Sequence, residues 1–407
     1  MTSSNGLEKR PKLRFPGFDE PWQTTLLSSV FAKNTQKNAD GRITNVICNS
    51  AKQGLIPQRE YFDKDIANSD NTSGYYIIEE NDFVYNPRKS SDAPYGPISS
   101  YKYTEAGIVS PLYLCFRAKK EINPLFFEWY FRSSVWHRYV YMFGDSGARH
   151  DRVSIKDDVF FAMPINLPSA QEQEHIAAFL DRLDQKIEKQ RTLVENLKKY
   201  KRGVVRTLLS PKHCKLKNVE WTTAKIGNIG TFIKGAPLSK ADISSDGTPF
   251  ILYGELYTTY NEVISKVVRK TQASVDKQYY SQIGDVIIPT SGETPEEIST
   301  ASCVMLPDII LAGDLNIYRC TQVDGRIMSY ILNHVVNDRI ARVAQGKSIV
   351  HVQATEISKI EITYPDLISQ KKLIETFDAI TARIDQSMRE LELLQVHRKA
   401  LLQQLFI

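Results

Sequence analysis

Two stretches of about 40 residues, one in each half of the chain, repeat a single pattern of apolar residues. The pattern steps alternately by four and three positions, which is the a/d seam of a coiled-coil helix. The seam positions that we expect to be buried are Ile176, Leu180, Leu183, Ile187, Val194 and Leu197 in the first stretch and Leu373, Phe377, Ile380, Ile384, Leu391 and Leu394 in the second. Polar residues interrupt both seams at matching places, namely Gln190 and Lys201, then Ser387 and Arg398. Paired seam positions are 373 − 176 = 197 residues apart throughout, and two helices in one register indicate an internal duplication.

The duplication extends beyond the helices. Landmarks outside the seam positions recur at nearly the same offset: Trp22, Phe31, Pro168 and Gln173 have Trp221, Phe232, Pro365 and Gln370 as counterparts. A fixed offset of about 200 residues predicts two copies of one unit. We therefore expect globular segments at residues 1–168 and 211–365 and long helices at residues 169–210 and 366–407.

The order of the segments predicts the direction of the helices. The second globular segment begins where the first helix ends and finishes where the second helix begins. Parallel helices would force this segment to bridge their full length, about 48 Å at 1.5 Å per residue, whereas antiparallel helices bring those ends together. The expected fold class is α+β: two mixed α/β segments held apart by an antiparallel coiled coil, with an internal pseudo two-fold repeat.

Composition limits the class of protein. Charged residues make up 24% and hydrophobic residues 42%, which is typical of soluble globular chains. The five cysteines form no C-x-x-C pair, which argues against a disulfide framework or a zinc ribbon. The polar N-terminus lacks the apolar core of a signal peptide and no stretch resembles a membrane span, so we expect a cytoplasmic protein without a membrane partner. A net charge of +5 permits a nucleic-acid partner without requiring one.

Short β-rich runs punctuated by Gly, Pro, Asn and Asp predict mixed α/β structure in both globular segments. In the first segment, residues 125–143 have helical spacing with an aromatic stripe, which we expect to be core rather than a platform for stacking bases. In the second segment, residues 226–233 and 286–289 are the clearest predicted strands.

Two polar loops in the first segment and one in the second are candidate ligand-binding sites. The first two contain glycine or proline beside positive charge, and the third, at the repeat's own offset, contains Gly346. Glycine lets a backbone approach a ligand closely, and arginine matches phosphate groups and guanine edges. The candidate DNA contacts are Arg88, Lys89, Arg149 and Arg152 in the first segment and Lys347 and Ser348 in the second. A solvated surface loop is the competing interpretation.

Motifs for catalysis are incomplete. Gly346-Lys347-Ser348 suggests a phosphate-binding loop, but Ala341 stands where its first glycine is required. Residues 123–126, Asn-Pro-Leu-Phe, lack the second proline of the Asn-Pro-Pro-Phe tetrad of amino methyltransferases. The seven histidines show no spacing typical of metal ligands. We expect no catalytic residue and no metal site in this chain.

Three local phrases and the repeat architecture carry a family resemblance. Residues 14–18 read Arg-Phe-Pro-Gly-Phe, residues 85–88 read Tyr-Asn-Pro-Arg, and Pro168 precedes Glu172-Gln173 at the first helix. With them, nearly the whole chain resembles the specificity subunits of type I restriction–modification systems. The second helix departs from the pattern because Ser369 stands where the first has Glu172.

The resemblance implies a function and a set of partners. Each globular segment would be a target recognition domain that binds double-stranded DNA, within a complex with two modification (methyltransferase) subunits and two restriction (translocase/nuclease) subunits. The chain itself would bind no cofactor, and the complex would use S-adenosylmethionine, ATP and Mg through those partners. The alternatives are a self-contained DNA methyltransferase or nuclease, which needs a donor or metal site, and a purely structural coiled-coil scaffold, which sequence-specific DNA retention would exclude.

Overall fold

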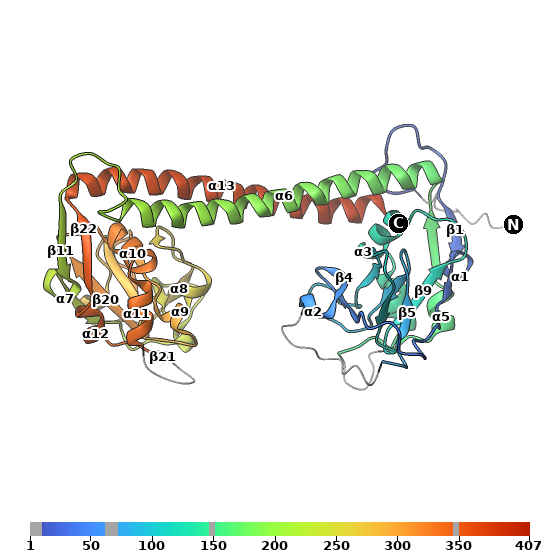
Figure 1. Cartoon of the computed structure of the whole chain (residues 1–407), viewed down its shortest axis with the longest axis horizontal. Coiled ribbons are helices and arrows are strands. Elements are labelled where there is room, and N and C mark those ends of the chain that lie inside the picture. Colours follow the sequence, from blue (N-terminus) through green and yellow to red (C-terminus); the bar gives the residue numbers. More distant parts are fainter. Residues whose placement is uncertain (1–9, 62–71, 146–150, 345–349) are drawn as a thin grey trace. The chain divides into compact units, whose positions relative to one another are not determined.

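The computed structural model describes residues 10–61, 72–145, 151–344 and 350–407 (Figure 1). The chain divides into two compact units, one formed by Met1–Gln190 with Glu390–Ile407 and the other by Arg191–Arg389. We call them unit 1 and unit 2. Each unit contains one globular segment and about half of each of two long helices, α6 (Ala170–Leu208) and α13 (Leu367–Leu405).

Unit 1 is built from short strands and helices between Gln23 and Leu167. The strands are β1 (Gln23–Leu26), β2 (Phe31–Lys33), β3 (Ile47–Ser50), β4 (Gly54–Pro57), β5 (Tyr76–Ile78), β6 (Phe83–Tyr85), β7 (Ile98–Ser100), β8 (Gly107–Val109), β9 (Leu114–Ala118) and β10 (Pro164–Leu167). The helices are α1 (Leu27–Val30), α2 (Gln58–Tyr61), α3 (Pro124–Arg132), α4 (His137–Phe143) and α5 (Asp157–Phe161). Its main sheet has the order β2-β9-β6-β7, and β1 pairs with β10.

Unit 2 repeats this plan with more strands. They are β11 (Trp221–Lys225), β12 (Gly230–Lys234), β13 (Thr248–Leu252), β14 (Val263–Ile264), β15 (Arg269–Thr271), β16 (Asp285–Pro289), β17 (Ser291–Gly292), β18 (Ser302–Val304), β19 (Ile310–Ala312), β20 (Leu315–Cys320), β21 (Val350–His351) and β22 (Glu361–Pro365). The helices are α7 (Ile226–Ile229), α8 (Glu255–Thr258), α9 (Pro295–Ile298), α10 (Gly325–His334), α11 (Asn337–Val343) and α12 (Ala354–Ser358), with 3₁₀ turns at Lys240–Asp242 and Lys277–Tyr279. The main sheet, β12-β20-β16-β18-β14, matches the strand order of unit 1 and adds one strand at its edge.

The cores of the two units differ in composition. In unit 1, aromatic rings fill the space between the main sheet and α3, as where Phe31 meets Phe127 edge to face at 5.0 Å. In unit 2, aliphatic residues dominate the equivalent space between the main sheet and α10. In each unit the apolar face of the main sheet packs against the apolar face of one helix, and this contact excludes water. Each unit therefore has its own apolar core.

Within each unit, α6 and α13 run antiparallel, as the order of the segments predicts (Figure 1). In unit 1 the start of α6 packs against the end of α13, where Ile176 and Leu180 join the same core as Leu405. In unit 2 the end of α6 packs against the start of α13, where Val205 joins Leu373 and Phe377. Each of the twelve expected seam positions is buried or half-buried.

The polar interruptions of the seam join the helices to other charged groups. Lys201 Nζ donates to Glu262 Oε2 at 2.8 Å in unit 2, and Arg398 forms an ion pair with Asp184 in unit 1. Asp184 also faces Arg132 of α3, at 3.5 Å. The interruptions therefore fasten each helix pair to neighbouring elements instead of only weakening the seam.

The start of each long helix explains the departure noted at Ser369. In α6, Glu172 accepts two hydrogen bonds from Arg14, at 2.7 and 2.8 Å. In α13, the hydroxyl of Ser369 donates to Asp366 at 2.7 Å and its backbone N–H to the same carboxylate at 2.9 Å. The two helix starts are thus satisfied by different local contacts.

Two sequence-based predictions of local structure are wrong in part. Residues 226–233 do not form one strand: Ile226–Ile229 form α7, and β12 begins at Gly230, where an added Cβ would lie 2.4 Å from the ring of Tyr318. Residues 125–143 are not one helix, because Ser133 ends α3 by donating its backbone N–H and its hydroxyl to carbonyls of the preceding turn. The aromatic stripe itself is core, as predicted: Phe127, Tyr130 and Phe131 are buried.

Candidate nucleic-acid interface

The two candidate loops of unit 1 lie side by side, although more than 60 residues separate them in sequence. The backbone N–H of Lys89 donates to the carbonyl of Asp151 at 2.8 Å, and the backbone N–H of Val153 donates to the carbonyl of Pro87 at 2.9 Å. Arg88 and Arg152 stand opposite each other in this short antiparallel bridge. Both arginines are exposed, whereas Lys89 is half-buried.

The two exposed arginines are also close to Tyr113. Burial raises the pKa of the Tyr113 hydroxyl, and the positive charges of Arg152 and Arg88 act in the opposite direction. Two guanidinium groups and a phenol therefore share one surface of unit 1. Guanidinium groups donate to phosphate oxygens or to guanine, and a tyrosine contributes both an apolar ring and a hydrogen-bonding hydroxyl.

Three of the candidate contacts, Arg149, Lys347 and Ser348, lie outside the described residues. The neighbouring backbone is described. Asp145 and Ser154 exchange two hydrogen bonds of 2.7 Å, and β21 pairs with β17 in unit 2.

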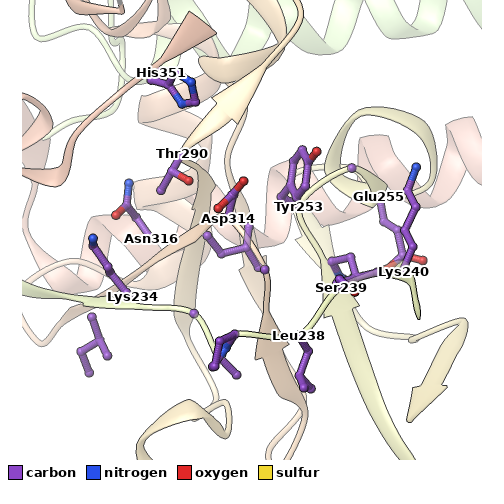
Figure 2. Close-up of a pocket in the computed structure, with 18 of the residues that line it drawn as sticks. Lys234, Leu238, Ser239, Lys240, Tyr253, Glu255, Thr290, Asp314, Asn316 and His351 are labelled. Carbon is purple, nitrogen blue, oxygen red and sulfur yellow. Dashed lines mark hydrogen bonds between the residues drawn. The ribbon is translucent and has the colours of Figure 1, made fainter. Parts of the chain in front are cut away.

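Unit 2 contains a large hollow, of about 1580 Å³, which no sequence motif indicated. Figure 2 shows side chains from several elements around it, with Asn316 and Asp314 from the β20 region, Lys234 from the end of β12 and His351 from β21. We call it the unit-2 hollow. Its residues are spread between positions 232 and 355, so only folding brings them together.

Polar and charged side chains surround the unit-2 hollow. Arg269 pairs with Glu255 at 3.0 Å, and Asp314 accepts a hydrogen bond of 3.0 Å from Ser291. In the part of the chain that the structure describes, neither Lys234 nor Lys240 forms an ion pair, and both are exposed. The lining has Lys234, Lys240 and Arg269 against Glu255 and Asp314, a charge of 3 − 2 = +1, which favours an anionic ligand.

A smaller hollow of about 260 Å³ lies in unit 1, and we call it the unit-1 hollow. Tyr113 and Val153 line it, which places it beside the bridge that carries Arg88 and Arg152. Lys33 also lines it and donates to Asp157 at 2.5 Å.

The described residues lack the groups that a metal site or a membrane span requires. They contain no cluster of three or more His, Cys, Asp or Glu side chains arranged to hold a metal ion, and none of their helices is long and apolar enough to cross a membrane. The five cysteines are all free thiols.

Comparison with known proteins identifies the repeated unit. The family model for the type I restriction modification DNA specificity domain matches residues 21–198 and again residues 218–395. The two matches begin 218 − 21 = 197 positions apart, which is the offset of the helical seams. None of the curated proteins is significantly similar in sequence.

Solved structures with the same fold include two chains that match along nearly their whole length. A chain from a study of complex assembly and conformational transition in a type I R-M system has a TM-score of 0.63 at 14% identity, with 96% of this chain and 98% of that chain covered. The type I restriction–modification S subunit from M. genitalium has a TM-score of 0.54 at 14% identity, with 98% and 99% covered. At this identity the likeness concerns the fold.

The family matches together span most of the chain and follow its internal repeat. The chain therefore belongs to the type I restriction–modification DNA specificity family, and it is a DNA-recognition subunit made of two tandem specificity domains.

Proposed function

We propose that this chain selects the target of a type I restriction–modification complex by reading two separate half-sites of double-stranded DNA. In this proposal residues 1–168 and 211–365 are the two target recognition domains, and residues 169–210 and 366–407 are the helices that space them. The observation that carries the proposal is the contrast between framework and lining. The strand order β2-β9-β6-β7 recurs as β12-β20-β16-β18, while the hollows beside these sheets have different residues. One framework with two linings is suited to reading two different sequences.

The proposed partners are two modification subunits and two restriction subunits. The repeat supports the number two, because a duplicated helix pair offers two similar surfaces and each can bind one copy of the same partner. A structural neighbour comes from a type I R-M system studied for its complex assembly, which supports partners of this class. A complex that acts on cellular DNA works in the cytoplasm, where we place this chain.

We infer that the chain is not itself catalytic. The near misses at the phosphate-loop and methyltransferase motifs support this inference. S-adenosylmethionine, ATP and Mg would be bound by the partner subunits. The contribution of this chain would be to position those subunits on a chosen DNA sequence.

The DNA target follows from the duplication. Because the hollows of the two units have different lining residues, we expect the two half-sites to have different sequences. The target is therefore expected to be bipartite and non-palindromic. Two recognition domains on one face of B-DNA are best placed about one helical turn, or roughly 10 base pairs, apart. Half-sites of roughly three or four base pairs then leave an unread gap of about six or seven, and we expect a gap within roughly five to eight.

The test is to map methylated bases in DNA from cells that contain this gene with its methyltransferase partner, and from matched cells that lack only this gene. The proposal predicts one bipartite methylated motif that disappears with the gene. Methyl transfer or DNA cleavage by the purified single chain would favour the self-contained enzyme. If the purified complex retains no specific DNA sequence, the result would favour the interpretation of the chain as a purely structural scaffold.

A further inference from the structure

The two hollows occupy corresponding places in the repeat. Leu114 lines the unit-1 hollow and Asn316 lines the unit-2 hollow. They hold equivalent positions, because each is opposite the third residue after the buried aspartate of its unit, Tyr85 or Ile288. Lys33 ends β2 and Lys234 ends β12, and these two strands pair with β9 and β20 in the same way. The hollow is therefore a feature of the repeated framework rather than an accident of one unit.

The residues at this shared place differ between the units. In unit 1, Leu114 holds the position equivalent to Asn316, and it packs against the aromatic core. In unit 2, Lys234 is opposite Asn316 across β12 and β20. An apolar residue in one copy is thus replaced by a polar amide in the other, at the edge of a much larger hollow.

Asn316 has a buried donor without a partner. The residue is only 2% exposed, and its Nδ2 finds no hydrogen-bond acceptor among the described residues. Leaving a buried amide without a hydrogen bond destabilises the folded state, so such a group is uncommon unless it has a role beyond folding. Asn316 lines the unit-2 hollow together with Lys234, and Figure 2 shows these two side chains next to each other.

The size and charge of the unit-2 hollow fit the edge of a DNA duplex better than a small molecule. Its volume of about 1580 Å³ exceeds the roughly 300–1,000 Å³ typical of small-ligand pockets. Its two uncompensated lysines, Lys234 and Lys240, suit backbone phosphates. A side-chain amide is the group that pairs with adenine in the major groove, by donating to N7 and accepting from N6.

We propose that the unit-2 hollow receives the second half-site of the DNA target, that Asn316 is a specificity-determining residue that reads a base edge there, and that Lys234 holds the adjoining phosphate. This inference rests on the proposed function and assigns residues to it. Since Asn316 is buried, its neighbours must move before a base contacts it, and the exposed side chain of Lys234 on the opposing strand is free to turn toward a phosphate.

The experiment uses the complex of the full chain with its methyltransferase subunits and maps the methylated motif for four variants. Asn316→Ala and Lys234→Ala alter the hollow. Asn333→Ala is the matched control for the amide, because Asn333 bonds to the carbonyl of Ala301 and does not line the hollow. Lys225→Ala is the control for the lysine, because Lys225 is exposed on β11 and lies outside the hollow.

Asn316→Ala should lower the preference at one base of the second half-site by about 5- to 150-fold, with the first half-site and the gap unchanged. Lys234→Ala should weaken binding to all sequences alike and reduce the salt dependence of binding, with the motif unchanged. Both controls should keep the motif and the binding of the unaltered complex.

An unchanged motif for a folded Asn316→Ala complex overturns the assignment, as does a change confined to the first half-site. If Asn316→Ala does not fold, as judged by its melting temperature, the exposed Lys234→Ala decides: unchanged DNA binding and salt dependence then overturn the assignment. Occupancy of the hollow by a small ligand would also leave the motif unchanged. An unaltered complex that methylates no specific sequence contradicts the proposed function instead, so the two failures are distinguishable.

Discussion

Asp82 and Asp285 are buried carboxylates at matching positions of the two units, with 1% and 2% of their surface exposed. Each accepts two hydrogen bonds from one arginine on the neighbouring strand, Arg117 at 2.6 and 2.7 Å and Arg319 at 3.0 Å twice. Each also accepts a backbone N–H from three residues earlier. The repeat therefore survives in single ion pairs within segments whose sequences have little in common.

A second buried charge cluster joins the end of α6 to the globular segment of unit 2. Glu262 accepts hydrogen bonds from Lys201 at 2.8 Å and from His334 at 2.7 Å, and Lys201 lies over the ring of Tyr330. Burial by itself raises the pKa of the Glu262 carboxyl, but the hydrogen bond from His334 and the charge and hydrogen bond of Lys201 outweigh burial and lower the pKa to about 2. Because the folded pKa is below the ordinary value of 4.5, this stabilisation is complete above pH 4.5 and is lost as the pH falls toward 2.

Glu262→Gln should therefore lower the free energy of unfolding of unit 2 by about 3 kcal/mol at pH 7. Below pH 4.5 the difference between wild type and variant should shrink, because the wild-type carboxylate becomes protonated. Hydrogen exchange of the α10 amides across this pH range measures the effect. Glu361→Gln, at an exposed position of β22, is the control and should change little. A difference that stays constant from pH 7 to pH 2 would contradict the role given to the carboxylate.

Arg88 and Arg152 give the corresponding test on the surface of unit 1. Replacing either arginine by alanine should lower the preference at one base of the first half-site by about 5- to 150-fold if that arginine reads guanine. A phosphate contact should instead weaken binding to all sequences and reduce its salt dependence. DNA binding and methylation mapping of the complex separate these results. Arg42→Ala is the control, since Arg42 is 85% exposed and pairs with Asp40 in its own loop. Unchanged DNA binding after both substitutions would show that the bridge of Arg88 and Arg152 does not contact DNA.

At the scale of elements, the long helices were predicted well because their pattern is local and long. The expected helices at residues 169–210 and 366–407 correspond to α6 and α13, and the antiparallel packing within each unit agrees with the order of the segments. Short elements were predicted less well. Residues 226–229 read as a strand from apolar content alone, but Ile226 and Ile229 face the core with the spacing of one helical turn.

The candidate site depends even more on contacts between residues that are distant in sequence. The loops that carry Arg88 and Arg152 were recognisable from glycine, proline and charge, but their backbone bridge depends on contacts across more than 60 residues. The unit-2 hollow had no local signal, since Lys234, Asn316 and His351 meet only after the sheet forms. The equivalence of Leu114 and Asn316 likewise appears only from the strand register.

The seam of α6 and α13 provides a test at the scale of elements. Leu180 is fully buried in the core of unit 1, whereas Leu393 of α13, in the same unit, is 55% exposed. Leu180→Ala should lower the free energy of unfolding by about 2–5 kcal/mol, because it removes buried apolar surface and leaves a cavity. Leu393→Ala should change it by less than about 0.5 kcal/mol. Denaturant unfolding of the purified chain measures both, and equal effects would contradict the seam assignment.

At the scale of the whole molecule, the chain is an internal duplication of one structural unit. The family match and the helical seam repeat at an offset of 197 residues and the landmark residues at 197 to 201, while the linings of the two hollows differ. Duplication of a framework with divergence of its lining lets one chain present two recognition surfaces, and we expect the helices to determine the spacing between the two half-sites.

The duplication also predicts how many modification subunits the complex contains. If each copy of the helical repeat binds one modification subunit, native mass measurement should find two identical modification subunits for each copy of this chain. Salt titration during the measurement separates weak from stable association. A stable complex that never takes up a second modification subunit would show that the repeat does not form the docking surface.

The most direct measurement of the central claim is methylation mapping of a chimera. Residues 221–364 are replaced by the equivalent segment of another member of the family, and the complex is otherwise unchanged. We predict that one half-site of the methylated motif changes to that of the donor protein, while the other half-site and the gap stay the same. A motif altered in both halves, or a native target that proves to be continuous, would contradict the account.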